Sequence, residues 1–284
     1  MICGTRINRN VEVLRLLDIL ILNPIAFDLG PLQVHWYGIF IASAVLLAVW
    51  LSAREADRQS MDSENIYDLI LYALPIAIVS ARIYYVAFQW GYYREHLNEI
   101  VKIWDGGIAI YGALIGAGIV VYSFCRHRRI SIWTMLDVIA PTIIMGQAIG
   151  RWGNFMNQEA FGQVTSLAFL RHLHLPSFII NQMLIQGEYR QPTFLYESLW
   201  DALGFVLLMS LRHAPRLFKR GEVFLCYVGW YAFGRFFIEG MRTDSLMLGN
   251  IRISQWLSVL LVIISISLII LRRLKRSDLS WYFD

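Results

Sequence analysis

The sequence predicts an all-α integral membrane protein with about seven transmembrane helices and an extracytoplasmic head or lid segment. Three observations support this fold class. Of the 284 residues, 57% are hydrophobic and only 16% are charged, whereas soluble domains carry about 25% charged residues. Seven mostly apolar stretches approach the length that crosses a bilayer, about 20 residues. Basic residues gather in alternate connections between these stretches, as they do in cytoplasmic loops.

The seven predicted helices follow one another along the chain, with one long connection after the fourth. The fourth and sixth are the least apolar because polar residues intrude at their ends. Glycines four residues apart, at 112 and 116 and again at 146 and 150, have the small-residue spacing that is typical of tight helix packing in membranes. The seven ranges are 35–53, 67–89, 108–125, 132–150, 194–211, 222–240 and 254–272.

The arginines and lysines orient these helices. Thirteen lie in the segments that follow the first, third, fifth and seventh helices, and ten lie in the longer opposite set. The positive-inside rule then predicts an external N-terminus and a cytoplasmic C-terminus. We expect an N-terminal extension or interfacial segment at 1–25, one seven-span domain at 26–276 and a cytoplasmic tail at 277–284. The head covers about 154–192, and its 163–192 part is a candidate gate.

The cysteines give no sign of a disulfide framework. Cys3, Cys125 and Cys226 are odd in number and lie in unrelated contexts. No cluster of cysteine and histidine has metal-ligand spacing, so we expect neither a metal nor another cofactor. The N-terminus lacks a clean apolar core and a small-residue cleavage site, so we do not expect a signal peptide.

Arginines lie inside or at the outer end of three predicted helices. Arg82 lies in the second helix, Arg235 in the sixth and Arg151 at the exit of the fourth. We expect all three at one level of the outer leaflet. An arginine at mid-helix costs roughly 2.5–3.5 kcal/mol, and such residues mark functional sites by default. The alternative is that each arginine reaches the interface by itself to meet lipid phosphates.

The sixth helix carries a row of polar residues around Arg235. Tyr231, Arg235, Glu239 and Arg242 are 4, 4 and 3 positions apart, so they share one helix face. A structural ion pair between Arg235 and Glu239 is the alternative to a ligand site. Three arginines near one or two acids leave an excess of positive charge, which predicts a bound anion. At this depth the most abundant anion is a phospholipid phosphate.

Further polar residues lie at the outer ends of other predicted helices. Gly106 and Gly107 are candidates for a close approach of the backbone to a ligand. Trp36 is more typical of an interface anchor than of a catalyst. The complete set is His35, Trp36 and Tyr37 on the first helix, Asp105, Gly106, Gly107 and Tyr111 at the third, and Glu197 and Asp201 one turn apart on the fifth.

Other classes of seven-span protein fit less well. An anion transporter is the main alternative, but that class usually shows internal repeats or broken helices at mid-membrane, and we find no convincing repeat. A retinal-type receptor requires a lysine within a helix, and the predicted helices contain none. An intramembrane serine protease requires a serine–histidine pair within the membrane, and no histidine lies inside a predicted helix, since His35 only opens the first one.

The run GRWGNFMNQEAFG at residues 150–162 resembles the signature of a known family. It fits the pattern G-R-x-G-N-F-x-N-x-E-x-x-G at every fixed position. Four shorter blocks follow the same family's order and spacing: VHWYG (34–38), WDGG (104–107), QPTFLYE (191–197) and YAFGRFFIE (231–239). On these motifs the chain resembles the bacterial phosphatidylglycerol–prolipoprotein diacylglyceryl transferases over roughly residues 22–275.

The resemblance implies an activity and its partners. Such an enzyme moves diacylglycerol from phosphatidylglycerol to the lipobox cysteine of a prolipoprotein, the first step of lipoprotein maturation, and releases glycerol phosphate. The expected partners are phosphatidylglycerol, prolipoprotein signal peptides with a lipobox cysteine, and membrane lipid, but no nucleic acid. The expected location is the bacterial cytoplasmic membrane.

The resemblance also implies roles for single residues. Carried over by motif, Arg151 and Arg235 are the essential arginines, and Asn154, Gly162, Tyr37 and Tyr231 are supporting site residues. Their place in the sequence adds three candidates for substrate binding: Arg82, Glu239 and Arg242. Guanidinium donors that face the leaving oxygen should supply the main catalytic effect.

The base that takes the thiol proton stays open. Many family members have a histidine where this chain has Tyr111, and that histidine has been assigned as the base. The candidates here are Tyr111, whose phenol has an ordinary pKa of about 10, then Glu159, Tyr37 and His35. Glu159 is equally well explained as an anchor for an arginine. We expect the field of the arginines to do most of the thiol activation, because nearby cations lower a thiol pKa.

Overall fold

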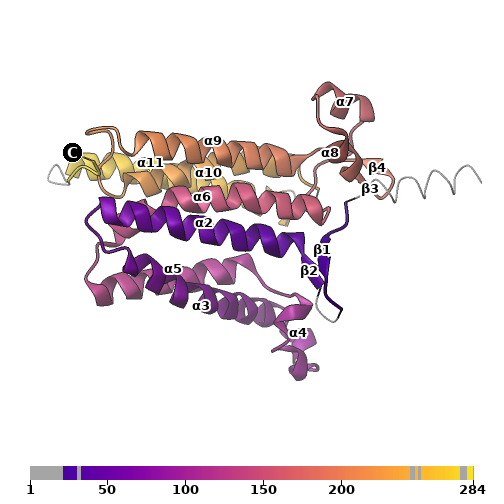
Figure 1. Ribbon diagram of the computed structural model, residues 1–284, viewed down its shortest axis with the longest axis horizontal. Coiled ribbons are helices and arrows are strands. Elements are labelled where there is room, and N and C mark those ends of the chain that lie inside the picture. The colour runs from indigo at the N-terminus through magenta and orange to yellow at the C-terminus, as the bar shows by residue number, and fades with distance from the viewer. Residues whose placement is uncertain (1–21, 31–32, 244–246, 249–250, 276–279, 284) are drawn as a thin grey trace, which may run out of the picture. The chain divides into compact units, whose positions relative to one another are not determined.

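The computed structural model describes residues 22–30, 33–243, 247–248, 251–275 and 280–283. Each of the seven predicted helices forms (Figure 1), and most ends lie within a few residues of the prediction. The fourth helix is the exception: it continues to Met156 instead of ending at residue 150, which puts Arg151 inside it. The seven are α2 (Trp36–Arg58), α3 (Glu64–Phe88), α5 (Ile110–Arg128), α6 (Ile132–Met156), α9 (Thr193–Leu211), α10 (Glu222–Met241) and α11 (Ile253–Lys275).

Six of these helices are long and apolar enough to cross a bilayer: α2, α3, α5, α6, α9 and α11. Helices suit that task because they satisfy their backbone hydrogen bonds internally. The protein is therefore a multi-pass membrane protein. α10 has 20 residues but carries Glu222, Arg235 and Glu239, so its role as the seventh span stays a prediction.

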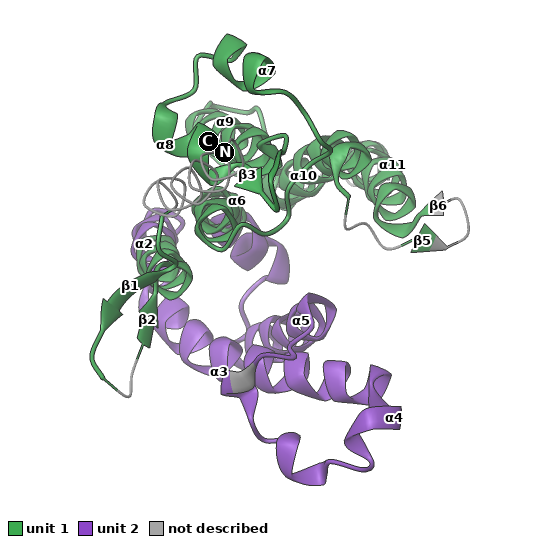
Figure 2. Cartoon of the chain, turned by 90° about the vertical axis from the view of Figure 1, so that its right-hand side faces the viewer, with its two compact units in different colours: residues 1–48, 140–284 green, residues 49–139 purple. Residues whose placement is uncertain are grey.

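The chain forms two compact units (Figure 2), one of residues 1–48 and 140–284 and one of residues 49–139. The expectation of a single domain from 26 to 276 is not tested by this grouping and stays a prediction. Residues 1–21 and 276–279 lie outside the described residues, and with them most of the predicted N-terminal segment and part of the predicted tail.

The second unit holds α3 and α5 together through small residues. A Cβ at Gly112 would lie 2.5 Å from the carbonyl oxygen of Ser80, and one at Gly116 would lie 2.4 Å from its Oγ. The predicted close packing at this glycine pair is confirmed. This unit also contains α4 (Trp90–Tyr93), η1 (Leu97–Glu99) and η2 (Ile103–Asp105).

The first unit contains α9, α10, α11, the start of α2 and the part of α6 from residue 140 onward. Gly146 and Gly150 on α6 do not make the tight contact that we predicted, because a Cβ there would lie 4.0 and 3.5 Å from the nearest atoms, which is ordinary spacing. Two short antiparallel hairpins flank the helices: β1 (Ile25–Asp28) with β2 (Gln33–His35), and β5 (Met247–Leu248) with β6 (Ile251–Arg252). The fold is thus helical apart from small hairpins.

The predicted head is a folded element on the end of α6. It contains α7 (Leu167–His172), α8 (Ser177–Gln182) and the hairpin of β3 (Leu184–Ile185) with β4 (Glu188–Tyr189). The buried side chain of Gln182 donates hydrogen bonds to the carbonyls of Phe155 and Met156, at 3.3 and 3.2 Å. These are among the carbonyls that a helix leaves unpaired at its C-terminus. The head therefore caps α6, and its function as a gate stays a prediction.

Candidate active site

The last two turns of α6 carry the first half of the signature. Arg151 and Asn154 are three positions apart, so they share one face of the helix. The Nη1 of Arg151 donates to the Oδ1 of Asn154 at 3.5 Å. The two predicted site residues therefore contact each other, with Asn154 placed to orient the guanidinium, and their substrate contacts stay predictions.

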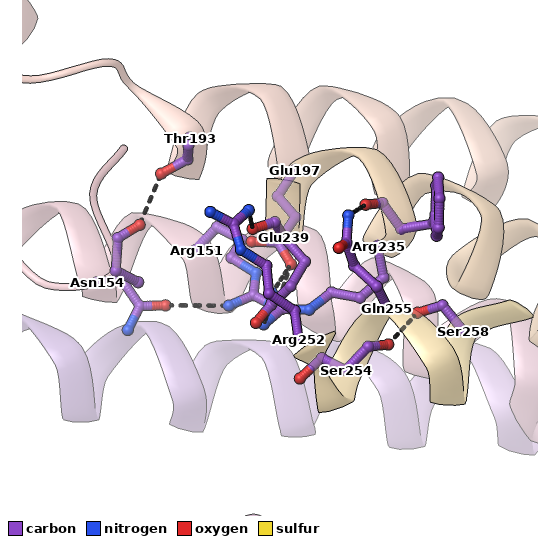
Figure 3. Close-up of polar contacts among 12 residues, drawn as sticks. Arg151, Asn154, Thr193, Glu197, Arg235, Glu239, Arg252, Ser254, Gln255 and Ser258 are labelled. Atoms are coloured by element: carbon purple, nitrogen blue, oxygen red, sulfur yellow. Dashed lines mark hydrogen bonds and ion pairs between the residues drawn. The ribbon is translucent and has the colours of Figure 1, made fainter. Parts of the chain in front are cut away.

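A carboxylate from α9 joins Arg151 and Arg235, the two arginines that the resemblance singles out. Oε1 of Glu197 lies 2.8 Å from Nη2 of Arg151 and 2.7 Å from Nη1 of Arg235 (Figure 3). On the other side, Nη2 of Arg235 lies 2.5 Å from the carboxylate of Glu239, one turn further along α10. Three helices thus supply one cluster, and Arg151 and Arg235 can reach a common ligand.

This arginine–glutamate cluster (Arg151, Arg235, Glu197 and Glu239) is buried and balanced in charge. The side chains of the two glutamates are each 3% exposed, and those of the arginines 18% and 17%. Two positive and two negative charges meet here, so the predicted excess of positive charge is wrong for this cluster. The physical reason is that Glu197 faces the arginines from α9, which the sequence alone does not reveal.

Some buried polar atoms near the cluster have no hydrogen-bond partner within the described part of the chain. They are Nε of Arg151 and both carboxylate oxygens of Asp201, whose side chain is fully buried one turn below Glu197. An unsatisfied buried donor or acceptor costs about 1–3 kcal/mol. Such atoms favour a ligand site because a substrate can complete their hydrogen bonds.

The aromatic site residues lie on α2 and α10. A Cβ at Gly153 would lie 2.5 Å from the ring of Tyr37, so the glycine of the signature lets this ring rest directly on α6. Tyr231 lies on α10 within electrostatic range of Arg151 and Arg235. Tyr231 is therefore on a helix of the cluster, Tyr37 packs on another of its helices, α6, and the site roles of both tyrosines stay predictions.

Gly162 and Arg242 join the end of the signature to the end of α10. They form an isolated antiparallel bridge, and the amide of Gly162 also donates to the carbonyl of Gln191 at 3.0 Å. A Cβ at Gly162 would lie 2.8 Å from the side chain of Gln191. Close packing thus explains this glycine, and substrate contacts of Gly162 and Arg242 stay predictions.

Glu159 lies on the turn that follows α6, not in the cluster. Its exposed side chain accepts a hydrogen bond from Nδ2 of Asn157 at 3.4 Å. The neighbouring residues Gln158 and Ala160 have left-handed backbone angles, with φ of 53° and 56°. His35, in β2, is also exposed. Among the described residues, neither Glu159 nor His35 has a contact with the arginines of the cluster, and a role as a base stays a prediction for both.

Arg82 and Tyr111 belong to the second unit. The guanidinium of Arg82 donates five hydrogen bonds to backbone carbonyl oxygens, with donor–acceptor distances of 2.6 to 3.3 Å. The acceptors are the carbonyls of Glu99, Ile100, Lys102, Gly106 and Gly107. A Cβ at Gly107 would lie 2.4 Å from Nη1 of Arg82, so the close backbone approach expected at this glycine is to the arginine. These contacts show that Arg82 fastens a loop, and a phosphate contact would require breaking some of them.

An apolar pocket of about 400 Å³ lies beside the cluster in the first unit. Trp152 follows Arg151 on α6 and Ser198 follows Glu197 on α9, and both line the pocket. The remaining lining is apolar: Phe40, Met145, Ala148, Ile149, Ala202 and Phe205. The volume is within the usual range of ligand pockets, roughly 300–1,000 Å³.

Glu197 is the cluster residue that the sequence analysis named only among the polar residues at helix ends, without a role. Its signal was present, since an acid within an apolar helix needs a partner, but neither of the arginines it contacts is near it in sequence. With Glu197 included, fold and site define a class: a multi-pass membrane protein with a buried arginine–carboxylate site next to an apolar pocket.

Comparison with known proteins identifies the family. A family model described as prolipoprotein diacylglyceryl transferase matches residues 24–271. A phosphatidylglycerol–prolipoprotein diacylglyceryl transferase of Pediococcus pentosaceus is 71% identical over 252 residues, 89% of this chain and 91% of that protein. Proteins of the same name from Ligilactobacillus salivarius and Lactiplantibacillus plantarum are 64% and 66% identical, over 93% and 92% of this chain and 98% and 93% of theirs. The chain belongs to the prolipoprotein diacylglyceryl transferase family, and the resemblance identified from the sequence is confirmed.

Proposed function

We propose that this protein transfers the diacylglyceryl group of phosphatidylglycerol to the thiol of a lipobox cysteine in a prolipoprotein. The observation that carries the proposal is the meeting of Arg151 and Arg235 at one carboxylate, Oε1 of Glu197. Each guanidinium has five N–H donors in a planar fork, which suits phosphate oxygens. Nε of Arg151 has no partner among the described residues, so it is a donor that a phosphodiester can use.

The reaction forms a C–S bond at the terminal glyceryl carbon and breaks the bond from that carbon to the phosphate ester oxygen. The ester oxygen keeps the bonding electrons, so glycerol phosphate leaves with a second negative charge. The thiol proton passes to a base. Fixed guanidinium donors stabilise the charge that develops on the phosphate, and such preorganised donors are usually the largest catalytic effect.

The balanced charge of the cluster fits this chemistry. Glu197 and Glu239 hold the arginines in place, so little reorganisation is needed when the substrate arrives. The phosphate then takes donors that the carboxylates leave unused. We propose that the apolar pocket beside Trp152 and Ser198 holds part of an acyl chain, because it opens next to the cluster and is lined mainly by apolar groups.

We also propose the finer location. The excess of basic residues in alternate connections supports a bacterial cytoplasmic membrane protein with an external N-terminus and a cytoplasmic C-terminus. In that orientation the end of α6 faces outward, where a translocated precursor and an outer-leaflet lipid meet. Two variants, Arg94→Cys and Arg216→Cys, test this orientation with a thiol reagent that does not cross membranes. Only the cysteine at position 94 should react from outside the cell.

An assay of purified protein tests the activity. The protein, vesicles of phosphatidylglycerol and a synthetic lipobox peptide should yield a peptide heavier by one diacylglyceryl group, detected by mass spectrometry. Arg151→Ala should abolish the product. Arg94→Ala is the matched control, because the Arg94 side chain is 63% exposed and lies outside the cluster. Absence of product with the wild-type protein, or an equal rate with Arg151→Ala, would contradict the proposal.

A further inference from the structure

Two tryptophans lock α9 and α10 together beside the arginine–glutamate cluster. The rings of Trp200 on α9 and Trp230 on α10 are stacked, with centroids 4.3 Å apart and an angle of 12° between their planes. Nε1 of Trp200 donates to the carbonyl oxygen of Trp230 at 3.1 Å, and Nε1 of Trp230 donates to the carbonyl oxygen of Trp200 at 3.1 Å. Each residue is therefore both donor and acceptor to the other.

Each tryptophan also rests on a glycine of the opposite helix. A Cβ at Gly234 would lie 2.2 Å from Nε1 of Trp200, and a Cβ at Gly204 would lie 2.4 Å from Nε1 of Trp230. Such distances are far below van der Waals contact, so any other residue at either glycine would push the indole away. We call these four residues, Trp200, Gly204, Trp230 and Gly234, the tryptophan clasp.

The clasp has a sequence signature. The pattern W-x-A-x-G occurs as WDALG at residues 200–204 of α9 and again as WYAFG at residues 230–234 of α10. Because the contacts are reciprocal, the two copies interlock as equivalent halves. In a bilayer, helix association depends on close packing around small residues and on interhelical hydrogen bonds, since lipid removes the hydrophobic driving force. The clasp supplies both.

Reciprocal contacts of this kind fix how far one helix can slide along the other. Each residue advances an α-helix by 1.5 Å, and a hydrogen bond tolerates only a few tenths of an ångström around its optimum. A shift by one residue would break both indole–carbonyl bonds and would bring each ring against a neighbour that carries a Cβ. The clasp therefore permits one register of α9 against α10.

That register determines the ion pair of the site. Glu197 lies three positions before Trp200, and Arg235 directly follows Gly234. Oε1 of Glu197 meets Nη1 of Arg235 at 2.7 Å, across the same pair of helices that the clasp joins. We propose that the tryptophan clasp is a positioning device, which sets the register of α9 and α10 and so places Glu197 on Arg235. The catalytic part of this inference rests on the proposed function.

Two conservative variants test the clasp. Trp200→Phe and Trp230→Phe each keep a stacked ring and remove one N–H donor. Misplacement of a catalytic group by about 1 Å can cost on the order of a hundredfold in rate, and each variant keeps one of the two indole–carbonyl bonds of the clasp, so the displacement should be smaller than that. We expect each variant to lower kcat roughly tenfold in vesicles of phosphatidylglycerol. Trp256→Phe is the matched control, because Trp256 is on α11 and 63% exposed, and it should keep wild-type turnover.

A double-mutant cycle separates positioning from general stability. If the clasp acts through the Glu197–Arg235 pair, Trp200→Phe should lose its effect on kcat in a chain that already carries Glu197→Gln. The double variant should then be no slower than Glu197→Gln alone. Independent structural damage would instead multiply the two losses, and that result would overturn the inference.

The same cycle, measured by thermal unfolding of the full chain, does not depend on turnover. Coupling between Trp200→Phe and Glu197→Gln in the free energy of unfolding supports the clasp, and additive losses overturn it. If the wild-type protein gives no lipidated peptide while this coupling is present, the proposed function fails and the clasp stands. If peptide is formed but the coupling is absent in both measurements, the clasp fails and the function stands.

Discussion

Replacement of Glu197 by glutamine removes the negative charge that two arginines share and keeps the shape of the side chain. Oε1 of Glu197 lies 2.8 Å from Arg151 and 2.7 Å from Arg235, and the side chain is only 3% exposed. Breaking a buried ion pair by removing one partner costs roughly 3–5 kcal/mol. The glutamine oxygen still accepts a hydrogen bond worth about 1 kcal/mol. We therefore expect Glu197→Gln to lower the free energy of unfolding by about 3 kcal/mol.

The same substitution should increase the stabilisation that an anionic lipid gives. Without the charge of Glu197, the two guanidiniums lose the one carboxylate that contacts both of them, so the cluster becomes more positive by one charge. A phosphodiester restores the balance and stabilises the folded state by its binding. In neutral detergent the variant should melt at a lower temperature than the wild type, and phosphatidylglycerol should raise its melting temperature more. Diacylglycerol, which lacks the phosphate, should not.

The control is an ion pair of the same length at the surface. Glu188 and Arg190 are 2.8 Å apart, but the Glu188 side chain is 53% exposed. Exposed pairs contribute only about 0–1 kcal/mol, so Glu188→Gln should leave the melting temperature nearly unchanged. Equal losses of stability in the two variants, or equal stabilisation of wild type and Glu197→Gln by phosphatidylglycerol, would refute the reasoning.

Three further outcomes follow from the structure. Gly107→Ala should cost about 2–3 kcal/mol of stability, because its Cβ would lie 2.4 Å from Nη1 of Arg82 at a φ of +73°. Gly91→Ala is the control and should be neutral, because no atom lies within 4 Å of its Cβ. Equal melting temperatures of the two variants would contradict the loop-fastening role of Arg82. Asp201→Asn should not destabilise the fold, because it removes a buried carboxylate that has no hydrogen-bond partner among the described residues; a lower melting temperature than that of the wild type would contradict this. Tyr282→Ala should lower the free energy of unfolding by about 3 kcal/mol, because this ring is 3% exposed within an apolar cluster, and calorimetry of the purified protein checks it.

The positions of the helices follow from the sequence because a bilayer imposes a length and an apolar composition on each span. The signature at residues 150–162 also indicated the site, since an arginine and several amides next to an apolar helix are costly in a bilayer unless they serve a function. One boundary was wrong. The sequence predicted that the fourth helix ends at residue 150, just before Arg151. The helix instead ends at Met156, where the side chain of Gln182 from the head donates a hydrogen bond to its last carbonyl.

The charge balance of the site could not be predicted in the same way. Hydropathy marks Glu197 and Arg82 as unusual, but it does not say what each one contacts. That depends on the register between helices far apart in sequence, which is set by interlocking side chains such as Trp200 against Gly234. The sequence by itself determined the membrane fold and the family, and it singled out Arg151 and Arg235 as candidate site residues. Only the tertiary structure decided that Glu197 bridges these arginines and that Arg82 binds backbone carbonyls, because a buried charge takes whichever partner the packing brings within reach.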